Sequence, residues 1–175
     1  RDLGEYERAW LVYRATIDSS FLIDSSLAAV LHDQGELLAS IDYQAALWWE
    51  YPDTSEVASS LFSLSQLLYE NAPNAHALGP QRRGLARGKP ETVEPSEADM
   101  LREAIDRLDD FLALHPASPL HDEAAFSKTS AYLELRDYER VVLLGERYAD
   151  WYDDSPHVSS FHYMTALGHF WERAY

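Results

Sequence analysis

Cysteine is absent from this 175-residue chain, and cations are scarce, with 14 Lys and Arg against 30 Asp and Glu. The lack of cysteine excludes disulfides, thiolate metal sites and cysteine nucleophiles, although it does not fix the compartment. The formal net charge of −16 argues against nucleic acid as the main partner, because phosphate binding requires cations. No apolar run approaches the roughly 18 residues that a membrane-spanning helix needs. With 46% hydrophobic residues, the composition indicates one acidic globular domain.

Strand signals are nearly absent as well, because no stretch alternates apolar and polar residues with enrichment in β-branched types. Helical spacing is present instead, for example at Leu101, Ile105, Leu108, Phe111 and Leu112. This spacing places apolar side chains on one face of a helix. The pattern predicts helices over residues 3–18, 21–33, 36–50, 56–71, 97–114, 120–135, 138–151 and 157–172.

Three breaks between these helices share one signature, at residues 49–55 (WEYPDTS), 114–119 (LHPASP) and 151–156 (WYDDSP). Proline cannot continue a helix, but it fits the first turn of the next one. Serine and threonine are good caps for a new helix N-terminus. Each break therefore predicts the end of one helix and the capped start of another.

The chain also repeats itself. Aligning Pro119 on Pro156 gives an offset of 37 residues and places Phe126 on Tyr163. Aligning the first break on the second needs an offset of 64 residues. Because the offset of 64 is longer than the offset of 37, the first repeat must contain extra residues. We predict that they form an inserted loop at about 73–96, because insertions into repeats map to loops.

Residues 131–141, Ala-Tyr-Leu-Glu-Leu-Arg-Asp-Tyr-Glu-Arg-Val, resemble the tetratricopeptide repeat (TPR) family of helix pairs about 34 residues long. In that family an aromatic residue lies near the end of helix A, and Gly-x-Tyr-x-x-Ala begins helix B. Small residues at Ser65, Thr129 and Ala166 match the family's close helix crossing. The chain departs from the pattern where Arg136 replaces the usual Gly and where Gly145 occupies a normally bulky position.

The resemblance implies an all-α fold, an α-solenoid of stacked antiparallel helix pairs that forms a right-handed superhelix. It implies a single TPR-like domain over 1–175, cut from a longer array. The breaks are similar to those of bacterial cell-envelope TPR proteins, including outer-membrane assembly lipoproteins. We therefore expect a periplasmic or envelope-associated protein, with a cytoplasmic one also compatible. The alternative is a non-repeat helical bundle.

In a TPR-like stack the first helix of each pair lines a concave groove. Each predicted set falls at i, i+4, i+7 and i+8, which places it on one stripe of its helix. The predicted groove residues are Phe62, Gln66, Tyr69, Glu70, Phe126, Ser130, Leu133, Glu134, Tyr163, Leu167, Phe170 and Trp171. Aromatic residues with acidic neighbours suit a peptide that carries aromatic, proline or basic groups. The alternative is that these rings pack against neighbouring helices as core.

The inserted loop is rich in positively charged residues, which are Arg82, Arg83, Arg87 and Lys89. A basic loop on an acidic body could dock onto the groove or contact an acidic partner. The alternative is a solvated linker. The run 84–89 lacks the spacing of a phosphate-binding loop, and Pro90 follows it in place of Ser or Thr.

No residue pattern indicates catalysis or metal binding. His157, His162 and His169 share one predicted helix, but their spacings of five and seven do not converge as metal ligands do. We therefore expect a non-catalytic scaffold that needs neither cofactor nor metal and binds a protein or peptide partner. Two alternatives are open: a structural spacer in a large multidomain protein, or a regulatory or substrate-presenting arm of an enzyme encoded elsewhere in the chain.

Overall fold

A computed structural model describes residues 28, 30–50, 55–84 and 89–173 of the chain. The helix expected at 3–18 lies outside these residues, as does most of the one expected at 21–33. The chain divides into two compact units. The first contains residues 1–57 and 80–94, and the second contains residues 58–79 and 95–175. Each unit is treated by itself below.

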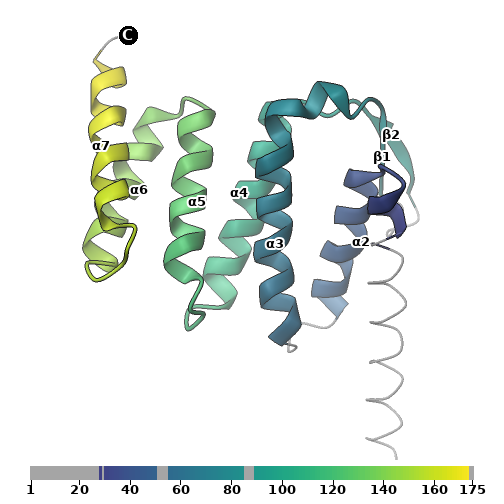
Figure 1. Ribbon diagram of the computed structural model, residues 1–175, viewed down its shortest axis with the longest axis horizontal. Coiled ribbons are helices and arrows are strands. Elements are labelled where there is room, and N and C mark those ends of the chain that lie inside the picture. The colour runs from purple at the N-terminus through teal and green to yellow at the C-terminus, as the bar shows by residue number, and fades with distance from the viewer. Residues whose placement is uncertain (1–27, 29, 51–54, 85–88, 174–175) are drawn as a thin grey trace, which may run out of the picture. The chain divides into compact units, whose positions relative to one another are not determined.

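The described chain is mostly helical, as the sequence predicts (Figure 1). Its helices are α2 (Leu37–Glu50), α3 (Ser55–Asn71), α4 (Glu97–Leu114), α5 (His121–Glu134), α6 (Tyr138–Trp151) and α7 (Val158–Glu172). These bounds agree with the predicted ones to within one residue at each end. The prolines and the polar caps between helices are local signals, so they place helix ends well.

The inserted segment is not the plain loop that the sequence led us to expect. It begins with a 3₁₀ helix, η1 (Ala72–Ala77), and then forms two antiparallel strands, β1 (Gln81–Arg83) and β2 (Glu91–Val93). Gln81 pairs with Val93, and Arg83 pairs with Glu91. Strands of three residues are too short to show an alternating pattern, which explains why the sequence did not reveal them.

The two strands belong to the first unit, where β1 packs against α2. The Gln81 side chain is buried, and its amide bonds two backbone groups near the start of α2. Its Oε1 accepts from the Leu38 N–H at 3.4 Å, and its Nε2 donates to the Gly35 carbonyl at 3.1 Å. A buried amide is stable only when its polar atoms are bonded, so Gln81 fixes the register of the strand against the helix.

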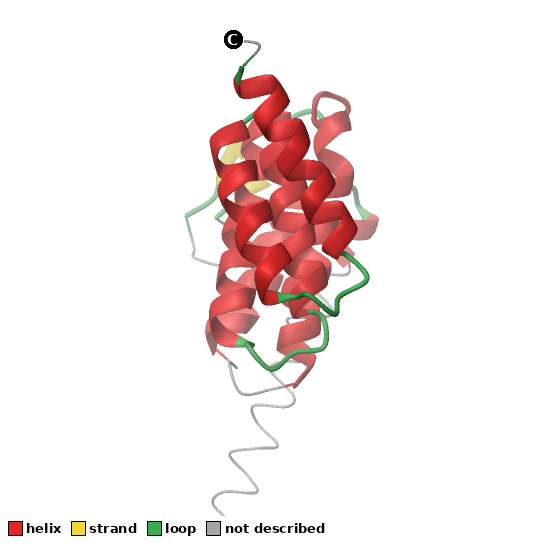
Figure 2. Cartoon of the chain, turned by 90° about the vertical axis from the view of Figure 1, so that its left-hand side faces the viewer, coloured by secondary structure: helices red, strands yellow, loops and turns green. Residues whose placement is uncertain are grey.

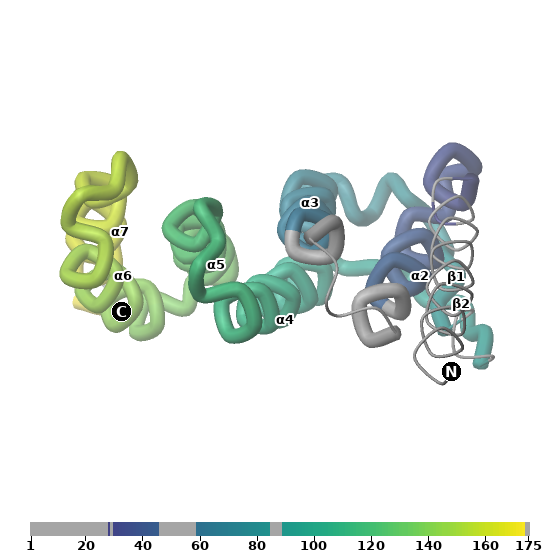
Figure 3. The backbone as a smooth tube through the Cα atoms, turned by 90° about the horizontal axis from the view of Figure 1, so that it is seen from below, coloured from purple at the N-terminus to yellow at the C-terminus, as the bar shows by residue number. Residues whose placement is uncertain are grey.

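In the second unit, helices α4 to α7 alternate in direction, and short loops join them (Figures 1 and 2). Seen along the helices, α4 lies to one side of α3 and α5 (Figure 3). One face of each helix is apolar, and these faces meet in the core of the unit. Around α6 and α7 the core residues are Ala125, Val141, Leu144, Tyr148, Ala149, Phe161 and Met164.

The serines in the breaks were expected to cap the next helix, but they bond to backbone in the turn before it. Ser118 Oγ accepts from the Leu120 N–H at 3.2 Å, and Ser155 Oγ accepts from the His157 N–H at 3.0 Å. Leu120 and His157 are themselves the N-caps of α5 and α7 and make no side-chain cap bond. Each serine therefore stabilises the turn that leads into the helix rather than the helix end itself.

Close crossing of α6 and α7 depends on two glycines. A Cβ on Gly145 would lie 2.3 Å from Thr165 Oγ1, and a Cβ on Gly168 would lie 2.7 Å from Val142 Cγ2. Of the small residues expected at crossings, Ser65 and Thr129 are buried, but Ala166 is exposed. Gly168 supplies the close approach on α7 instead. The unusual Gly145 of the repeat pattern thus has a packing role.

Candidate functional site

The twelve predicted groove residues all lie in the second unit, four each on α3, α5 and α7. On α3, two of them are used in packing. The Phe62 ring lies 5.8 Å from the Phe111 ring of α4, and Gln66 Nε2 donates to Ser127 Oγ of α5 at 2.7 Å. Phe62 therefore packs against a neighbouring helix, which is the alternative to an open groove, and Gln66 connects α3 to α5.

The end of α3 lies near the end of α5. The Tyr69 hydroxyl has a raised pKa, first because it is partly buried and second because the negative charge of Glu134 is close. Glu70, the next residue on α3, is exposed. Tyr69 thus lies within reach of the electrostatic field of Glu134.

On α5, the first two predicted residues are covered by α7. The Phe126 ring stacks on His157 at 4.7 Å and meets Phe161 edge-on at 6.3 Å. The Ser130 hydroxyl donates to the Phe126 carbonyl at 3.0 Å and lies 3.7 Å from Met164 Sδ. Phe126 and Ser130 are thus part of the α5–α7 contact and are half-buried.

On α7, the predicted aromatic residues are open to solvent. Tyr163 is 64% exposed, Phe170 63% and Trp171 38%. The Phe170 and Trp171 rings meet edge-on at 5.1 Å, and Trp171 stacks on Tyr138 of α6 at 6.3 Å. Large exposed aromatic side chains in a cluster mark surfaces that can bury a partner.

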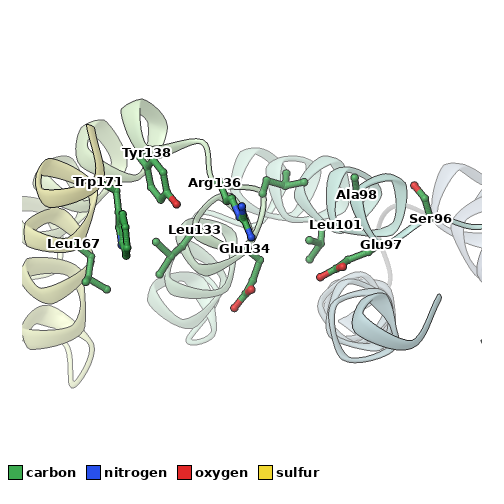
Figure 4. Close-up of a pocket in the computed structure, with 11 residues that line it drawn as sticks. Ser96, Glu97, Ala98, Leu101, Leu133, Glu134, Arg136, Tyr138, Leu167 and Trp171 are labelled. Atoms are coloured by element: carbon green, nitrogen blue, oxygen red, sulfur yellow. The ribbon is translucent and has the colours of Figure 1, made fainter. Parts of the chain in front are cut away.

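Four predicted residues line one pocket of about 770 Å³, which we call the α4–α7 pocket (Figure 4). They are Leu133 and Glu134 of α5 and Leu167 and Trp171 of α7. The pocket also contains residues that the sequence did not single out as a site: Ser96, Glu97, Ala98, Leu101, Leu135, Arg136 and Tyr138. Two other pockets in this unit are smaller, at about 520 and 460 Å³.

The pocket has an apolar and a charged part. Leu167 and Trp171 lie at one side, Glu97 and Leu101 lie at the other, and Leu133, Glu134 and Arg136 lie between them (Figure 4). Within the described residues, no ion pair is formed by Glu97, Glu134 or Arg136. A pocket with apolar surface and a few unpaired charges has the composition of a binding site.

Local structure places the charged residues. Ser96 Oγ accepts from the Asp99 N–H at 3.1 Å and so caps α4, which puts Glu97 in its first turn. Arg136 ends the α5 segment with a φ of 59°, in the left-handed region. Its N–H donates to the Leu133 carbonyl at 3.0 Å, and the Asp137 N–H donates to the Tyr132 carbonyl at 3.0 Å. Glycine is the usual residue at such a helix end.

A signal for Arg136 was present in the sequence, because it replaces the glycine that the repeat pattern has there. An arginine at a left-handed position costs backbone energy of order 1 kcal/mol that a glycine would avoid. Glu97 and Leu101 were missed for another reason. They lie on α4, whereas the resemblance to the repeat family implies a groove lined only by the first helix of each pair.

The basic loop residues belong to the first unit, and two of them bind its own carboxylates. Arg82 Nε lies 3.0 Å from Glu36 Oε1, and Arg83 lies 3.3 Å from Asp42 Oδ1. The Gly84 N–H also donates to Asp42 at 2.6 Å. Lys89 is exposed, and Arg87 lies outside the described residues. In the first unit, these arginines therefore attach the strands to the preceding helix.

The three histidines of α7 and its cap have different neighbours. His157 stacks on Phe126, His162 is exposed, and His169 lies between Glu146 and Glu172 at 3.7 and 3.6 Å. Within the described part of the chain, no three His, Asp or Glu side chains are arranged to hold a metal ion. None of the helices in that part is long and apolar enough to cross a membrane.

No protein-family model, curated protein or solved structure matches this chain. The similarity to TPR proteins is therefore carried only by the residues and spacings of the sequence.

Proposed function

We propose that this protein is a non-catalytic scaffold that holds a segment of a partner protein in the α4–α7 pocket. The observation that carries the proposal is the pocket itself, about 770 Å³ in volume, where Leu133, Leu167 and Trp171 present apolar surface beside unpaired charges. Trp171 is 38% exposed, so a ligand can contact its ring. Exposed tryptophan in a pocket is a typical anchor point for a partner.

The size of the pocket suits more than one side chain. Pockets for ligands commonly measure about 300 to 1,000 Å³. Burying one leucine-sized side chain contributes about 1.5 to 3 kcal/mol, so two such anchors contribute about 3 to 6 kcal/mol before ordering costs are subtracted. A micromolar complex needs about 8 kcal/mol, so we expect the pocket by itself to hold a segment weakly. In the described chain, the Phe170 and Trp171 rings are exposed next to Glu172, and this exposure supports a binding surface.

We further propose that the helices belong to a TPR-like solenoid with a right-handed superhelix. Support comes from the alternating directions of α4 to α7 and from the offset of 37 residues that relates α5 to α7. In such a stack the α4–α7 pocket would open on the inner surface, where solenoids bind partners. A setting in a bacterial cell envelope rests on the similarity of the breaks alone.

The test begins with peptides selected from a random phage-displayed library against the 175-residue chain. Their affinity is then measured by calorimetry for the parent, for Trp171→Ala and for Leu167→Ser. We expect each pocket variant to weaken binding about tenfold, because each removes an apolar contact. Circular dichroism must show that the variants keep the helicity of the parent.

Trp151→Ala is the matched control. Trp151 is 64% exposed on α6 and lies outside the α4–α7 pocket, so its removal should leave the affinity within about twofold of the parent. The proposal is overturned if the selected peptides bind the parent and all three variants equally. It is also overturned if the library yields no binder.

A further inference from the structure

We infer that the segment bound in the α4–α7 pocket carries a lysine or arginine next to its apolar anchor. The inference rests on the proposed function and specifies the partner of the same site. Glu97 and Glu134 both line the pocket, and neither has a cationic partner in the described part of the chain. A ligand that brings a positive charge would supply that partner.

The two carboxylates come from different helices. Glu97 lies in the first turn of α4, and Glu134 is the last residue of α5. The Tyr69 hydroxyl near Glu134 responds to its negative charge, which raises the tyrosine pKa beyond the effect of burial. Glu134 itself lines the pocket, so its negative charge lies where a ligand would bind. Charge complementarity of this kind selects partners and raises association rates.

Arg136 is the only cation among the residues that line this pocket. It lines the same pocket as the two glutamates, so the pocket residues carry one positive and two negative charges. A basic ligand would be repelled by Arg136, whereas an acidic ligand would be attracted to it. Removing the charge of Glu97 or Glu134 must therefore change the affinity in the opposite direction to removing the charge of Arg136. The sign of these changes identifies the charge of the ligand.

The apolar part of the pocket is suited to a long basic side chain. Lysine and arginine carry aliphatic stems that cover apolar surface while the charged end reaches polar groups. Leu133 and Leu167 offer surface for such a stem, and the partly exposed Trp171 side chain offers aromatic surface beside them. The same pocket thus accepts both an apolar anchor and the basic residue beside it.

The formal net charge of −16 would attract any basic peptide, so the test must separate the pocket from the overall field. Glu123→Gln does so. Glu123 is an exposed glutamate at the other end of α5, outside the pocket, and its substitution changes the net charge by the same amount as Glu134→Gln. A difference between these two variants reports the local contact.

The experiment uses an array of synthetic peptides in matched sets. Each set has one central leucine or tryptophan and differs only in whether the flanking residue is lysine, glutamine or glutamate. Binding of the whole protein is measured at low and at high salt. We expect the lysine sets to bind most strongly and the glutamate sets least, with the difference reduced at high salt.

For the lysine sets, Glu97→Gln and Glu134→Gln should each weaken binding about two- to fivefold, the size expected for one exposed ion pair. Arg136→Gly should strengthen binding by a similar factor, and Glu123→Gln should leave it unchanged. The inference is overturned, with the proposed function intact, if peptides bind without regard to the flanking charge. It is also overturned if glutamate sets bind best and Arg136→Gly weakens them. If no set binds, both the inference and the proposed function fail.

Discussion

Helices α5 and α7 are related by the 37-residue offset in the sequence, but they bury different parts of the corresponding face. Phe126 of α5 is half-buried and contacts His157 and Phe161, whereas Tyr163, its counterpart on α7, is 64% exposed. Thr129 is fully buried, whereas its counterpart Ala166 is exposed. On α5, the ring of Phe126 is covered by residues of α7 and its N-cap, whereas Glu134 at the end of the helix is exposed. Within the described chain, no helix covers the corresponding face of α7.

The difference shows what a repeat pattern can and cannot specify. Spacing along a helix decides which side chains share a face, because it follows from the helical period. Burial depends on whether another element packs on that face. The same aromatic position can therefore be half-buried on one helix and exposed on another.

The contrast between buried and exposed faces is tested most strongly by removing one aromatic ring from the buried side of α7 and one from its exposed side. Phe161 is fully buried and meets the rings of Phe126, Tyr148 and Tyr152. We expect Phe161→Ala to lower the free energy of unfolding by about 3 to 5 kcal/mol, because it leaves a cavity in the core. Tyr163→Ala should change it by about 0.5 kcal/mol or less.

Urea unfolding of both variants, followed by circular dichroism, measures the two effects. Because Phe161→Ala could leave the protein partly unfolded, Phe161→Leu serves as a milder variant, with an expected loss of about 1 to 2 kcal/mol. A loss for Tyr163→Ala as large as that for Phe161→Leu would show that the outer face of α7 is covered in solution. That result would contradict the contrast between α5 and α7.

Helices α4 and α6 differ in the size of the side chain at one buried position. Leu108 of α4 is 1% exposed, and the residue 37 positions later on α6 is Gly145. A Cβ at Gly145 would lie 2.3 Å from Thr165 Oγ1 and 3.1 Å from the Phe161 carbonyl oxygen. We therefore expect Gly145→Ala to destabilise the protein by about 2 kcal/mol, although alanine favours helices.

Leu143→Ala on the same helix is the control for Gly145→Ala. Leu143 is 53% exposed, so its truncation should cost about 0.5 kcal/mol or less. Thermal unfolding monitored by circular dichroism is enough to rank the two variants. A Gly145→Ala protein as stable as the parent would show that α6 and α7 can separate without cost, and the close crossing would then not be a requirement of the fold.

Local signals made the helices predictable from the sequence. Proline, serine and the apolar period act within a few residues, so the bounds of α4 and α6 could be read directly. The strands β1 and β2 could not, because three residues show no period and their register depends on Gln81 bonding residues more than 40 positions away. The role of Arg82 and Arg83 was missed for the same reason.

The candidate site was predictable only in part. Leu133, Glu134, Leu167 and Trp171 follow from the repeat pattern, because that pattern places them on one stripe of α5 and α7. Phe62 and Gln66 obey the same pattern but are used in packing between helices. Glu97 and Arg136 enter the pocket because a helix start and a helix end meet there. Such a meeting depends on tertiary structure, which a single helix period does not encode.

Tyr148 of α6 and Tyr163 of α7 offer the finest form of the contrast between buried and exposed rings. Tyr148 is 5% exposed, and burial, together with the negative charge of Asp109, raises its pKa from 10.0 to about 12. Between these two values the unfolded chain has lost the tyrosine proton while the folded chain keeps it. The free energy of unfolding must therefore fall as the pH rises from 10 toward 12.

At pH 11 the contribution of Tyr148 to this fall is about 1.4 kcal/mol relative to pH 8. Tyr148→Phe keeps the ring but cannot ionise, so its free energy of unfolding should fall less steeply over this range than that of the parent. Tyr152, whose pKa is also raised to about 12, continues to contribute in both proteins. Tyr163→Phe removes an exposed hydroxyl, so its free energy of unfolding should fall with pH as steeply as that of the parent. Urea titrations at pH 8, 10 and 11 measure the three curves, and identical curves for Tyr148→Phe and the parent would mean that Tyr148 ionises as freely in the folded protein as in the unfolded one.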